Sequence, residues 1–272
     1  MSLKAQIRNL ARQKDMSPQV VLQNYMFERF LMRLAASVYR DRFVLKGGML
    51  IAAMVGIENR ATMDMDATIR DYPVNSDSVE EAIKEICGTE GVDRVDFSIS
   101  GVRAIREEDD YGGFRVSLVA SFEGIITKMH IDITTGDAIT PKASMYLYHK
   151  IFEKGHIGIW AYNVETILAE KAESIIKRGE LNTRPRDFYD IYILTKTQDV
   201  DLRIFKEAIA ATVRHRKSLQ ILQDYSRHLE AIRNSTALQE QWLRYTKDYG
   251  YAAGISYEEI MVCLAMLLGQ GA

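Results

Sequence analysis

Residues 43–69, FVLKGGMLIAAMVGIENRATMDMDATI, place two aspartates one residue apart in a stretch that is otherwise largely apolar. FVLK has the β-branched and aromatic composition of a short strand, and it ends at Gly47 and Gly48. MLIAAMV then resumes as an apolar helix that stops at Gly56, and MDMDATI predicts a second strand. An unpaired buried carboxylate is costly, so these aspartates need a partner.

The pair Asp64 and Asp66 suggests a metal site. In a strand, alternation places both carboxylates on one face, roughly 6 to 7 Å apart, while Met63 and Met65 point into the core. Two carboxylates at this separation can bind one Mg²⁺ together or share two ions, an arrangement that supports attack on a phosphate. The alternative is a pair of solvent-facing aspartates on a half-exposed strand.

A third carboxylate lies in KMHIDITTGD at 128–137. Alternation puts Asp132 on one face of a strand together with Lys128 and His130, and the apolar residues between them on the other face. Asp132 could therefore complete a two-metal site, although it could also be an ordinary edge residue. No second histidine stands at ligand spacing from His130, so we expect that ring to have a structural role.

The glycine pair predicts a phosphate site. A strand that ends in Gly-Gly and turns directly into a helix offers unblocked backbone N–H groups at a helix N-terminus, which suits a triphosphate. Lys46 precedes the turn, and Arg60 and Thr62 stand just upstream of the aspartates, where they could orient the carboxylates or contact phosphate. Any tight turn can require glycine, so the combination with D-x-D is what gives the pattern specificity.

The rest of the chain divides into two parts. Residues 79–87 have the pattern of an amphipathic helix, and 92–100, 114–122 and 125–134 have the alternation of further strands, so we expect a mixed sheet. Helical periods dominate beyond residue 160, and the last helix opens with Ser256 and Glu259 in capping-box register. We therefore expect an α/β (α+β) domain over 1–160, with an N-terminal helix beginning at Ser17 and Pro18, and a mainly helical domain over 161–272.

Composition excludes several classes of protein. The 272 residues are 47% hydrophobic and 26% charged, as in an ordinary globular chain, and a net charge of −2 requires any nucleic acid to meet a local basic patch. Cys87 and Cys263 have no spacing typical of a thiolate metal site or a disulfide framework. The sequence contains neither a secretory leader pattern nor an apolar run long enough to span a bilayer. We expect a cytoplasmic protein.

The helical half contains further candidate residues. Lys171 and Arg178 lie two turns apart on one helix face, where they would either form a solvated basic stripe or clamp a triphosphate. Asp187 and Asp190 lie one turn apart, and Asp187 also suits the first turn of a helix, so capping is an equally good explanation for it. Arg186 could pair with either carboxylate.

Five blocks taken together resemble a known family: FVLKGGMLIAAMVG, NRATMDMD, HIDITTGD, LAEKAESIIKR and RPRDFYDIYIL. Their order is similar to that of the nucleotidyltransferase superfamily that includes DNA polymerase beta, and more narrowly to the AbiEii/AbiGii family of toxin nucleotidyltransferases. The blocks run from residue 43 to 194, about half of the chain. The resemblance implies a polymerase-beta-like core followed by a helical domain, and nucleotide transfer from an NTP in toxin–antitoxin and abortive-infection systems.

The resemblance also implies residue roles. Asp64, Asp66 and Asp132 would hold Mg²⁺, or Mn²⁺ as an alternative, and Asp132 would help to deprotonate the attacking hydroxyl. One departure is that the superfamily's Gly-Ser is Gly-Gly here, with Met49 following, which removes one hydroxyl donor to phosphate. The expected catalytic residues are Asp64, Asp66, Asp132 and Lys171, and the expected nucleotide-binding residues are Lys46, Gly47, Gly48, Arg60, Thr62, Arg178, Arg186, Asp187 and Asp190.

The expected partners are an NTP substrate, an RNA acceptor such as tRNA, and an antitoxin protein from a neighbouring gene. Basic clusters that could meet RNA, or could simply be solvated surface, are found in three segments of the chain. These basic residues are Lys4, Arg8, Arg12 and Lys14, the run RHRK at 214–217, and Arg227, His228 and Arg233.

Three alternative functions remain open: a protein nucleotidylating enzyme, a catalytically silent antitoxin-binding module, and a metal-dependent nuclease.

Overall fold

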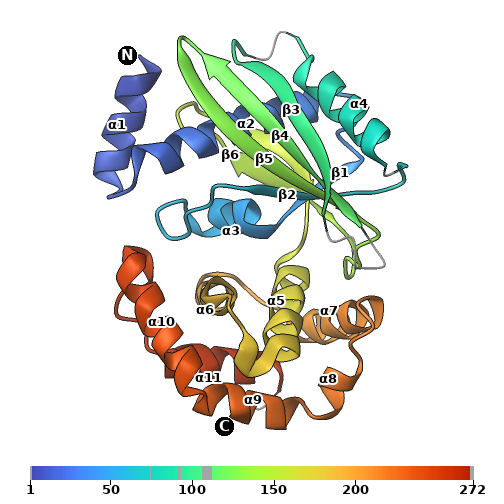
Figure 1. Cartoon of the computed structure of the whole chain (residues 1–272), viewed down its shortest axis with the longest axis vertical. Coiled ribbons are helices and arrows are strands. Elements are labelled where there is room, and N and C mark those ends of the chain that lie inside the picture. The colour runs from blue at the N-terminus through green and yellow to red at the C-terminus, as the bar shows by residue number, and fades with distance from the viewer. Residues whose placement is uncertain (1, 74, 91–92, 106–111, 270–272) are drawn as a thin grey trace. The chain divides into compact units, whose positions relative to one another are not determined.

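The computed structural model describes residues 2–73, 75–90, 93–105 and 112–269 (Figure 1). The chain forms two compact units, which we call the sheet unit (Met1–Gly136 with Ala143–Tyr162) and the helical unit (Asp137–Lys142 with Asn163–Ala272). The polar stretch after the long strands therefore belongs to the helical unit, where Thr140 accepts hydrogen bonds from Asn163 Nδ2 and Thr166 Oγ1.

The sheet unit contains both helices and strands, whereas the described residues of the helical unit form helices. The elements of the sheet unit are α1 (Leu3–Gln13), α2 (Pro18–Ala36), β1 (Phe43–Lys46), α3 (Gly47–Val55), β2 (Met65–Ile69), α4 (Ser76–Cys87), β3 (Asp96–Ile105), β4 (Gly113–Phe122), β5 (Ile125–Thr135), β6 (Ser144–His149) and β7 (His156–Ala161). Those of the helical unit are α5 (Val164–Arg178), η1 (Gly179–Leu181), α6 (Pro185–Thr197), α7 (Leu202–His215), α8 (Gln220–Gln223), α9 (Tyr225–Asn234), α10 (Thr236–Asp248), η2 (Gly250–Ala252) and α11 (Tyr257–Leu267).

Within the described residues, seven strands form one mixed sheet in the order β3-β4-β5-β2-β1-β7-β6. β2 pairs with β5 and β1 pairs with β7 in parallel, and the other neighbours are antiparallel. The predicted fold class, an α/β fold with a mixed sheet followed by helices, is confirmed. β1 occupies the predicted residues, but β6 and β7 were not expected from the sequence.

Helix α2 packs on one face of the sheet. Ser17 caps it by accepting a hydrogen bond from the Gln19 amide, as the Ser-Pro pair predicts. α2 packs against α4, β5 and β7, and Figure 1 shows it crossing the sheet. On β5 the predicted alternation is confirmed, because Ile131 and Ile133 are fully buried while Asp132 between them is half-buried. Asp132 therefore lies on the face opposite to α2.

The predicted strand at 63–69 is two residues shorter in the structure, because β2 begins at Met65. The expectation that Met63 points into the core is wrong, since its exposed fraction is 40%. Just before β2, side chains of α2 make the backbone hydrogen bonds that a neighbouring strand would otherwise make. Gln23 donates to the carbonyl of Met63, and Asn24 donates to that of Thr62. Asp64 is consequently exposed rather than held in a ladder.

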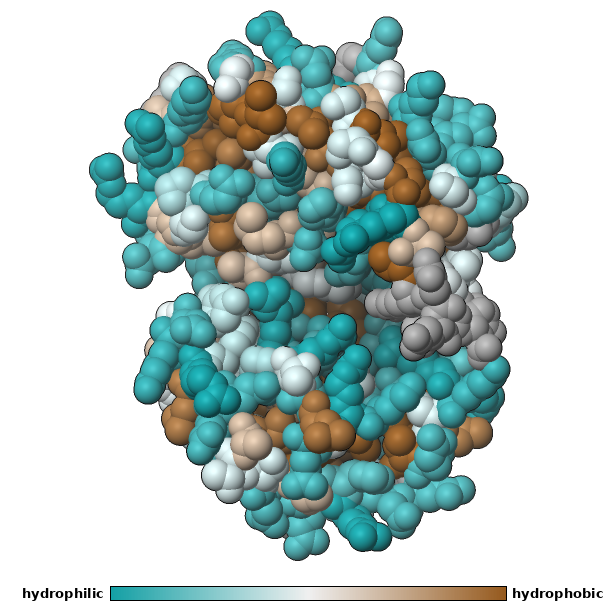
Figure 2. All heavy atoms as spheres, in the orientation of Figure 1, coloured by the Kyte–Doolittle hydropathy of each residue, from teal (hydrophilic) through white to brown (hydrophobic). Residues whose placement is uncertain are grey.

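The helical unit is built around α5, which packs against α6 and α7. Its core includes Phe188, Tyr189 and Trp242, each no more than 2% exposed. Ser256 and Glu259 form the predicted capping box of α11. Hydrophilic spheres dominate the face of this unit in Figure 2, with hydrophobic residues in small islands. Among the described residues, none of the helices combines the length and apolarity needed to cross a membrane.

Candidate active site

Four charged residues stand side by side across the middle of the sheet. Strand pairing aligns Lys46 of β1 with Asp66 of β2, Asp66 with Asp132 of β5, and Asp132 with Arg115 of β4. Residues paired directly across neighbouring strands project from the same face and can interact. We call Lys46, Asp66, Asp132 and Arg115 the charged row. Two carboxylates thus lie next to each other with a cation at each end.

The Gly-Gly turn lies directly against the charged row. Gly47 has a φ of +66°, which favours glycine, and a Cβ added there would lie 2.7 Å from Asp66 Cγ and still closer to Oδ2. A side chain at position 47 would therefore displace the carboxylate of Asp66. The geometry explains the glycine without reference to a ligand, and it brings the first backbone turn of α3 next to the acid.

Gly48 is needed for a different reason. A Cβ added there would lie 2.9 Å from Thr62 Oγ1 and 3.2 Å from a guanidinium nitrogen of Arg60. Both side chains are buried, at 5% and 2% exposure, and Arg60 also donates to the carbonyl of Ala61. The hydroxyl of Thr62 therefore occupies the space into which a serine at position 48 would project. This is the physical reason for the departure from Gly-Ser.

Lys46 is held inside the sheet unit. Its side chain is 5% exposed, its ammonium group donates to Thr134 Oγ1 over 2.7 Å, and it stands over the ring of Tyr162 at 5.7 Å. Lys46 therefore places a positive charge next to Asp66 in the charged row and directly before the Gly-Gly turn.

Asp132 forms an ion pair with Arg115, which is not among the site residues predicted from the sequence. Arg115 Nε and Nη2 each donate to one carboxylate oxygen over 2.6 Å, the bidentate geometry that makes the strongest pairs. The hydrogen-bonded carboxylate raises the pKa of Arg115 against the effect of burial, and the negative charges of Asp132, Asp64 and Asp66 act in the same direction. One sequence signal was available: Arg115 is the only charged residue in the stretch that forms β4.

The donor chemistry of this site suits a divalent cation. Asp64 is exposed, Asp66 is half-buried, and carboxylate oxygens are the ligands that Mg²⁺ and Mn²⁺ prefer. Within the described part of the chain, no three His, Cys, Asp or Glu side chains are assembled to hold an ion. Mg²⁺ in nucleotide enzymes is commonly held by one or two carboxylates together with substrate phosphates and water, so Asp64 and Asp66 fit such an ion.

The second group of predicted residues lies in the helical unit. Lys171 of α5 contacts two carboxylates of α6, Asp187 at 2.6 Å and Asp190 at 2.9 Å. The side chain of Asp190 is completely buried. Asp187 is thus part of an ion cluster that joins two helices, and it also stands in the first turn of α6. Ser174 bridges this cluster to Arg178, since its hydroxyl lies 3.4 Å from Asp187 and accepts a hydrogen bond from Arg178.

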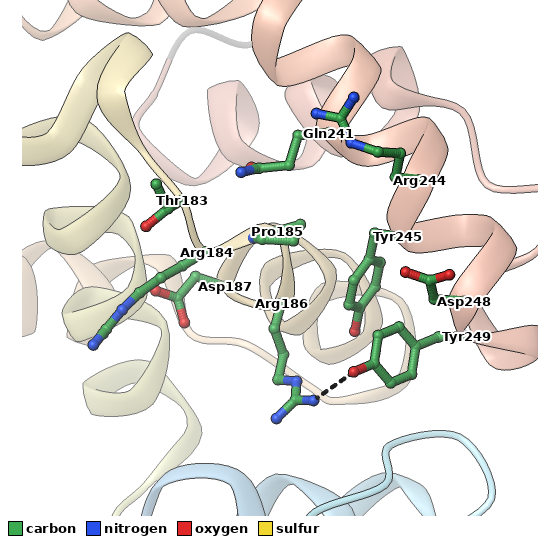
Figure 3. A pocket seen from close by; sticks show the side chains of 10 residues that line it. All are labelled: Thr183, Arg184, Pro185, Arg186, Asp187, Gln241, Arg244, Tyr245, Asp248 and Tyr249. Atoms are coloured by element: carbon green, nitrogen blue, oxygen red, sulfur yellow. Dashed lines mark hydrogen bonds between the residues drawn. The ribbon is translucent and has the colours of Figure 1, made fainter.

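The guanidinium groups near this cluster differ in their surroundings. The pKa of Arg178 is lowered by burial and by the nearby positive charge of Arg184. Arg186 donates to the hydroxyl of Tyr249 over 3.2 Å and does not form one of the ion pairs with Asp187 or Asp190 that the sequence allowed (Figure 3). The predicted site residues therefore fall into one group in each unit.

The basic segments also differ from one another. Arg216 pairs with Glu170 at 2.9 Å and with Glu173 at 2.8 Å, and these carboxylates raise its pKa against the effect of burial. Arg233 has a looser pair with Glu258 at 3.7 Å, and Lys14 pairs with Glu58. The stripe on α1 is exposed to solvent, and it comprises Lys4, Arg8 and Arg12.

Comparisons with known proteins bear on the family and on the fold. Residues 29–261 match the family described as nucleotidyl transferase AbiEii toxin of a type IV toxin–antitoxin system. Two solved Helicobacter pylori structures, one described as a candidate nucleotidyltransferase and one as JHP933, each share 15% identity and a TM-score of 0.52. The first alignment covers 94% of this chain and 97% of the other, and the second covers 93% and 94%. No curated protein matches. The chain belongs to the AbiEii family of nucleotidyltransferase toxins.

Proposed function

We propose that this protein is a Mg²⁺-dependent toxin that transfers a nucleotide from an NTP to a hydroxyl of RNA and releases pyrophosphate. One observation supports the proposal: the Gly47–Gly48 turn, which we propose binds phosphate, lies directly against Asp66 in the charged row, which we propose binds the metal. Together they suit positioning and charge neutralisation, on which phosphoryl-type transfer depends.

Asp64 and Asp66 would hold Mg²⁺, or Mn²⁺ in its place. When bound, the ion would neutralise charge on the phosphates and on the leaving pyrophosphate. The backbone at the start of α3 would bind the terminal phosphates. Thr62, whose hydroxyl donates to the carbonyl of Asp64 over 3.1 Å, would orient that residue, and Arg60 beside it would add positive charge.

Asp132 would accept the proton of the attacking hydroxyl. The hydroxyl oxygen forms a bond to the α-phosphorus, the bond from that phosphorus to pyrophosphate breaks, and the proton passes to Asp132. This role requires one carboxylate oxygen to be released from Arg115, which otherwise engages both. Arg115 would then balance the negative charge that gathers beside the charged row.

Arg178 and Arg186 of the helical unit keep, as part of this proposal, the nucleotide-binding role that the family resemblance implies. The resemblance places Lys171 among the catalytic residues, and its contacts with Asp187 and Asp190 support a positioning role for all three, because they fix α6 against α5. The exposed stripe of α1 supports RNA, such as tRNA, as the acceptor, since phosphate contacts dominate binding to nucleic acid. An antitoxin protein is the expected partner, as the family is one of toxin–antitoxin systems.

The test incubates the protein with Mg²⁺, total RNA and each α-labelled NTP in turn. A variant carrying Asp64→Asn and Asp66→Asn is compared with Asp96→Asn, which removes an exposed carboxylate at the start of β3. We expect label on RNA with the wild type and with Asp96→Asn, and none with the double variant. Label on protein would show that the acceptor is wrong, and an absence of label from both macromolecules would overturn the enzyme itself.

A further inference from the structure

The helical unit contains a pocket of about 560 Å³ between the start of α6 and one side of α10 (Figure 3). This volume is in the range of pockets that bind small organic ligands, roughly 300 to 1,000 Å³. On the α10 side, Gln241, Arg244 and Tyr245 recur at helical spacing and thus share one face, and Tyr249 follows the helix. Arg184 and Arg186 line the α6 side.

The lining of the pocket has an excess of positive charge. Arg184, Arg186 and Arg244 contribute three guanidinium groups. Asp187 also lines the pocket, but its charge is met by Lys171 at 2.6 Å, which leaves Asp248 as the balancing carboxylate of the lining. Arg184 is exposed, and Arg244 has only a loose surface pair with Glu240 at 3.8 Å. Such surface pairs are weak, so Arg184 and Arg244 can turn to an anion.

The aromatic part of the pocket is fixed in place. The ring of Tyr249 packs on Tyr245, with ring centroids 4.6 Å apart, and Tyr245 is itself buried. The hydroxyl of Tyr249 accepts the hydrogen bond from Arg186, whose guanidinium carbon lies 5.5 Å from the ring centroid. Tyr249 is half-buried, so part of its ring remains accessible. A rigid, partly exposed ring beside guanidinium groups is suited to a ligand with a flat ring and a phosphate.

We propose that this pocket binds a nucleotide of single-stranded RNA, with the base packed on Tyr249 and the adjoining phosphates held by Arg184 and Arg244. The inference rests on the proposed function and deepens it, because it assigns part of the acceptor site to the helical unit. A free NTP suits the pocket less well, since a triphosphate is accompanied by Mg²⁺ and the lining would offer that ion Asp248 alone, because Asp187 is already committed to Lys171.

The experiment measures the binding of a short fluorescein-labelled single-stranded RNA by anisotropy, in EDTA and without NTP, over a series of salt concentrations. We expect Tyr249→Leu to weaken binding about tenfold, the usual loss for one stacked base. Tyr249→Phe keeps the ring and should stay within about threefold of the wild type, which separates stacking from the Arg186 hydrogen bond. Circular dichroism of each variant establishes that it is folded.

The two arginines are tested with a matched pair of charge changes. Arg184→Gln with Arg244→Gln should lower the slope of log affinity against log salt by about 1.4, or about 0.7 for each phosphate that the protein no longer neutralises. The control is Arg203→Gln with Lys206→Gln, which removes two exposed charges of α7 outside the pocket. An equal reduction of the slope in the control would mean diffuse attraction and would overturn the proposal, as would wild-type affinity of folded Tyr249→Leu.

A competition arm distinguishes the two sources of a nucleotide. Unlabelled single-stranded RNA should displace the probe, whereas ATP at the same nucleotide concentration should not. If ATP displaces the probe and unlabelled RNA does not, the pocket binds the NTP and the inference is overturned. The transfer assay with labelled NTP is independent of this binding. If label reaches RNA but Tyr249→Leu binds RNA as tightly as the wild type, only the assignment of the pocket is wrong. If label reaches protein, the RNA acceptor itself is wrong.

Discussion

The sheet unit and the helical unit each contain closely spaced aspartates, and they stabilise them in opposite ways. In D-x-D of the sheet unit, Asp64 is exposed and Asp66 is half-buried beside the Gly-Gly turn. In the helical unit, the carboxylate of Asp190 is completely buried, and Lys171 lies 2.9 Å from it and 2.6 Å from Asp187.

We propose that this difference separates acids that can serve a substrate from acids that hold the fold. A fully buried charge must find its partner inside the protein, because desolvation is otherwise too costly. Lys171 compensates the charge of both Asp187 and Asp190, from which its ammonium nitrogen lies 2.6 and 2.9 Å away. Asp64 is exposed and Asp66 is half-buried, so both carboxylates can be reached from solvent by an incoming cation.

The largest expected effect is on catalysis, from Asp66→Asn. This change keeps the shape of the side chain and removes the charge, so transfer of label to RNA should fall about a thousandfold. The free energy of unfolding should fall by only about 1 kcal/mol, because Asp66 is half-buried and asparagine keeps the shape of the side chain beside Lys46 in the charged row. Denaturant titration and initial rates measure the two quantities. A variant with most of its activity would exclude Asp66 from the site.

Lys171→Met should have the largest effect on stability. It leaves Asp187 and Asp190 buried without a cation and should lower the free energy of unfolding by about 3 kcal/mol, measured by urea titration. Lys206→Met, on the exposed side of α7, is the control and should change stability by less than about 0.5 kcal/mol. Adding Asp190→Asn to Lys171→Met should restore part of the loss, and further destabilisation instead would contradict the cluster's structural role.

Gly47→Ala tests the contact between the turn and Asp66. Both a positive φ and the carboxylate beside it oppose a Cβ, so we expect a loss of about 2 kcal/mol in the free energy of unfolding. Gly124→Ala is the matched control: its φ is +75°, but its Cβ would meet no atom within 4 Å. That variant should lose about 1 kcal/mol from backbone strain alone. Equal losses would mean that Asp66 does not crowd the turn.

Arg115→Gln should have the smallest effect, on metal binding without NTP. Removing the guanidinium frees both oxygens of Asp132 and removes a nearby positive charge, so Mn²⁺ affinity measured by paramagnetic resonance should rise about fivefold. Arg103→Gln, an exposed neighbour on β3, is the control and should have little effect. Weaker Mn²⁺ binding by Arg115→Gln would show that the pair is needed to orient Asp132 for the ion.

Local patterns predicted most of what is close in sequence. The strand at 43–46, the Gly-Gly turn, the alternation of β5 and the capping box of α11 all depend on neighbours within a few residues, and the structure confirms them. Family membership could be predicted from the order of the motif blocks, and the match over residues 29–261 confirms it.

The features that could not be predicted depend on residues that are far apart in the sequence. Arg115 meets Asp132 only because β4 and β5 pair in one particular register, and strand spacing alone does not specify that pairing. β7 joins the sheet by pairing in parallel with β1, more than a hundred residues earlier in the chain. Met63 is exposed because side chains of α2 satisfy the backbone that a strand would otherwise pair. Each case needed the tertiary structure.

The measurement that tests the central claim most directly is the rate of label transfer per folded molecule, compared between Asp66→Asn and Asp190→Asn at saturating Mg²⁺ and low temperature. The folded fraction of each variant comes from its own denaturant curve. We predict that Asp66→Asn is folded and inactive, whereas Asp190→Asn is less stable but keeps substantial activity in its folded fraction. An active Asp66→Asn, or an Asp190→Asn that is fully folded and inactive, would contradict the division between acids that serve the substrate and acids that hold the fold.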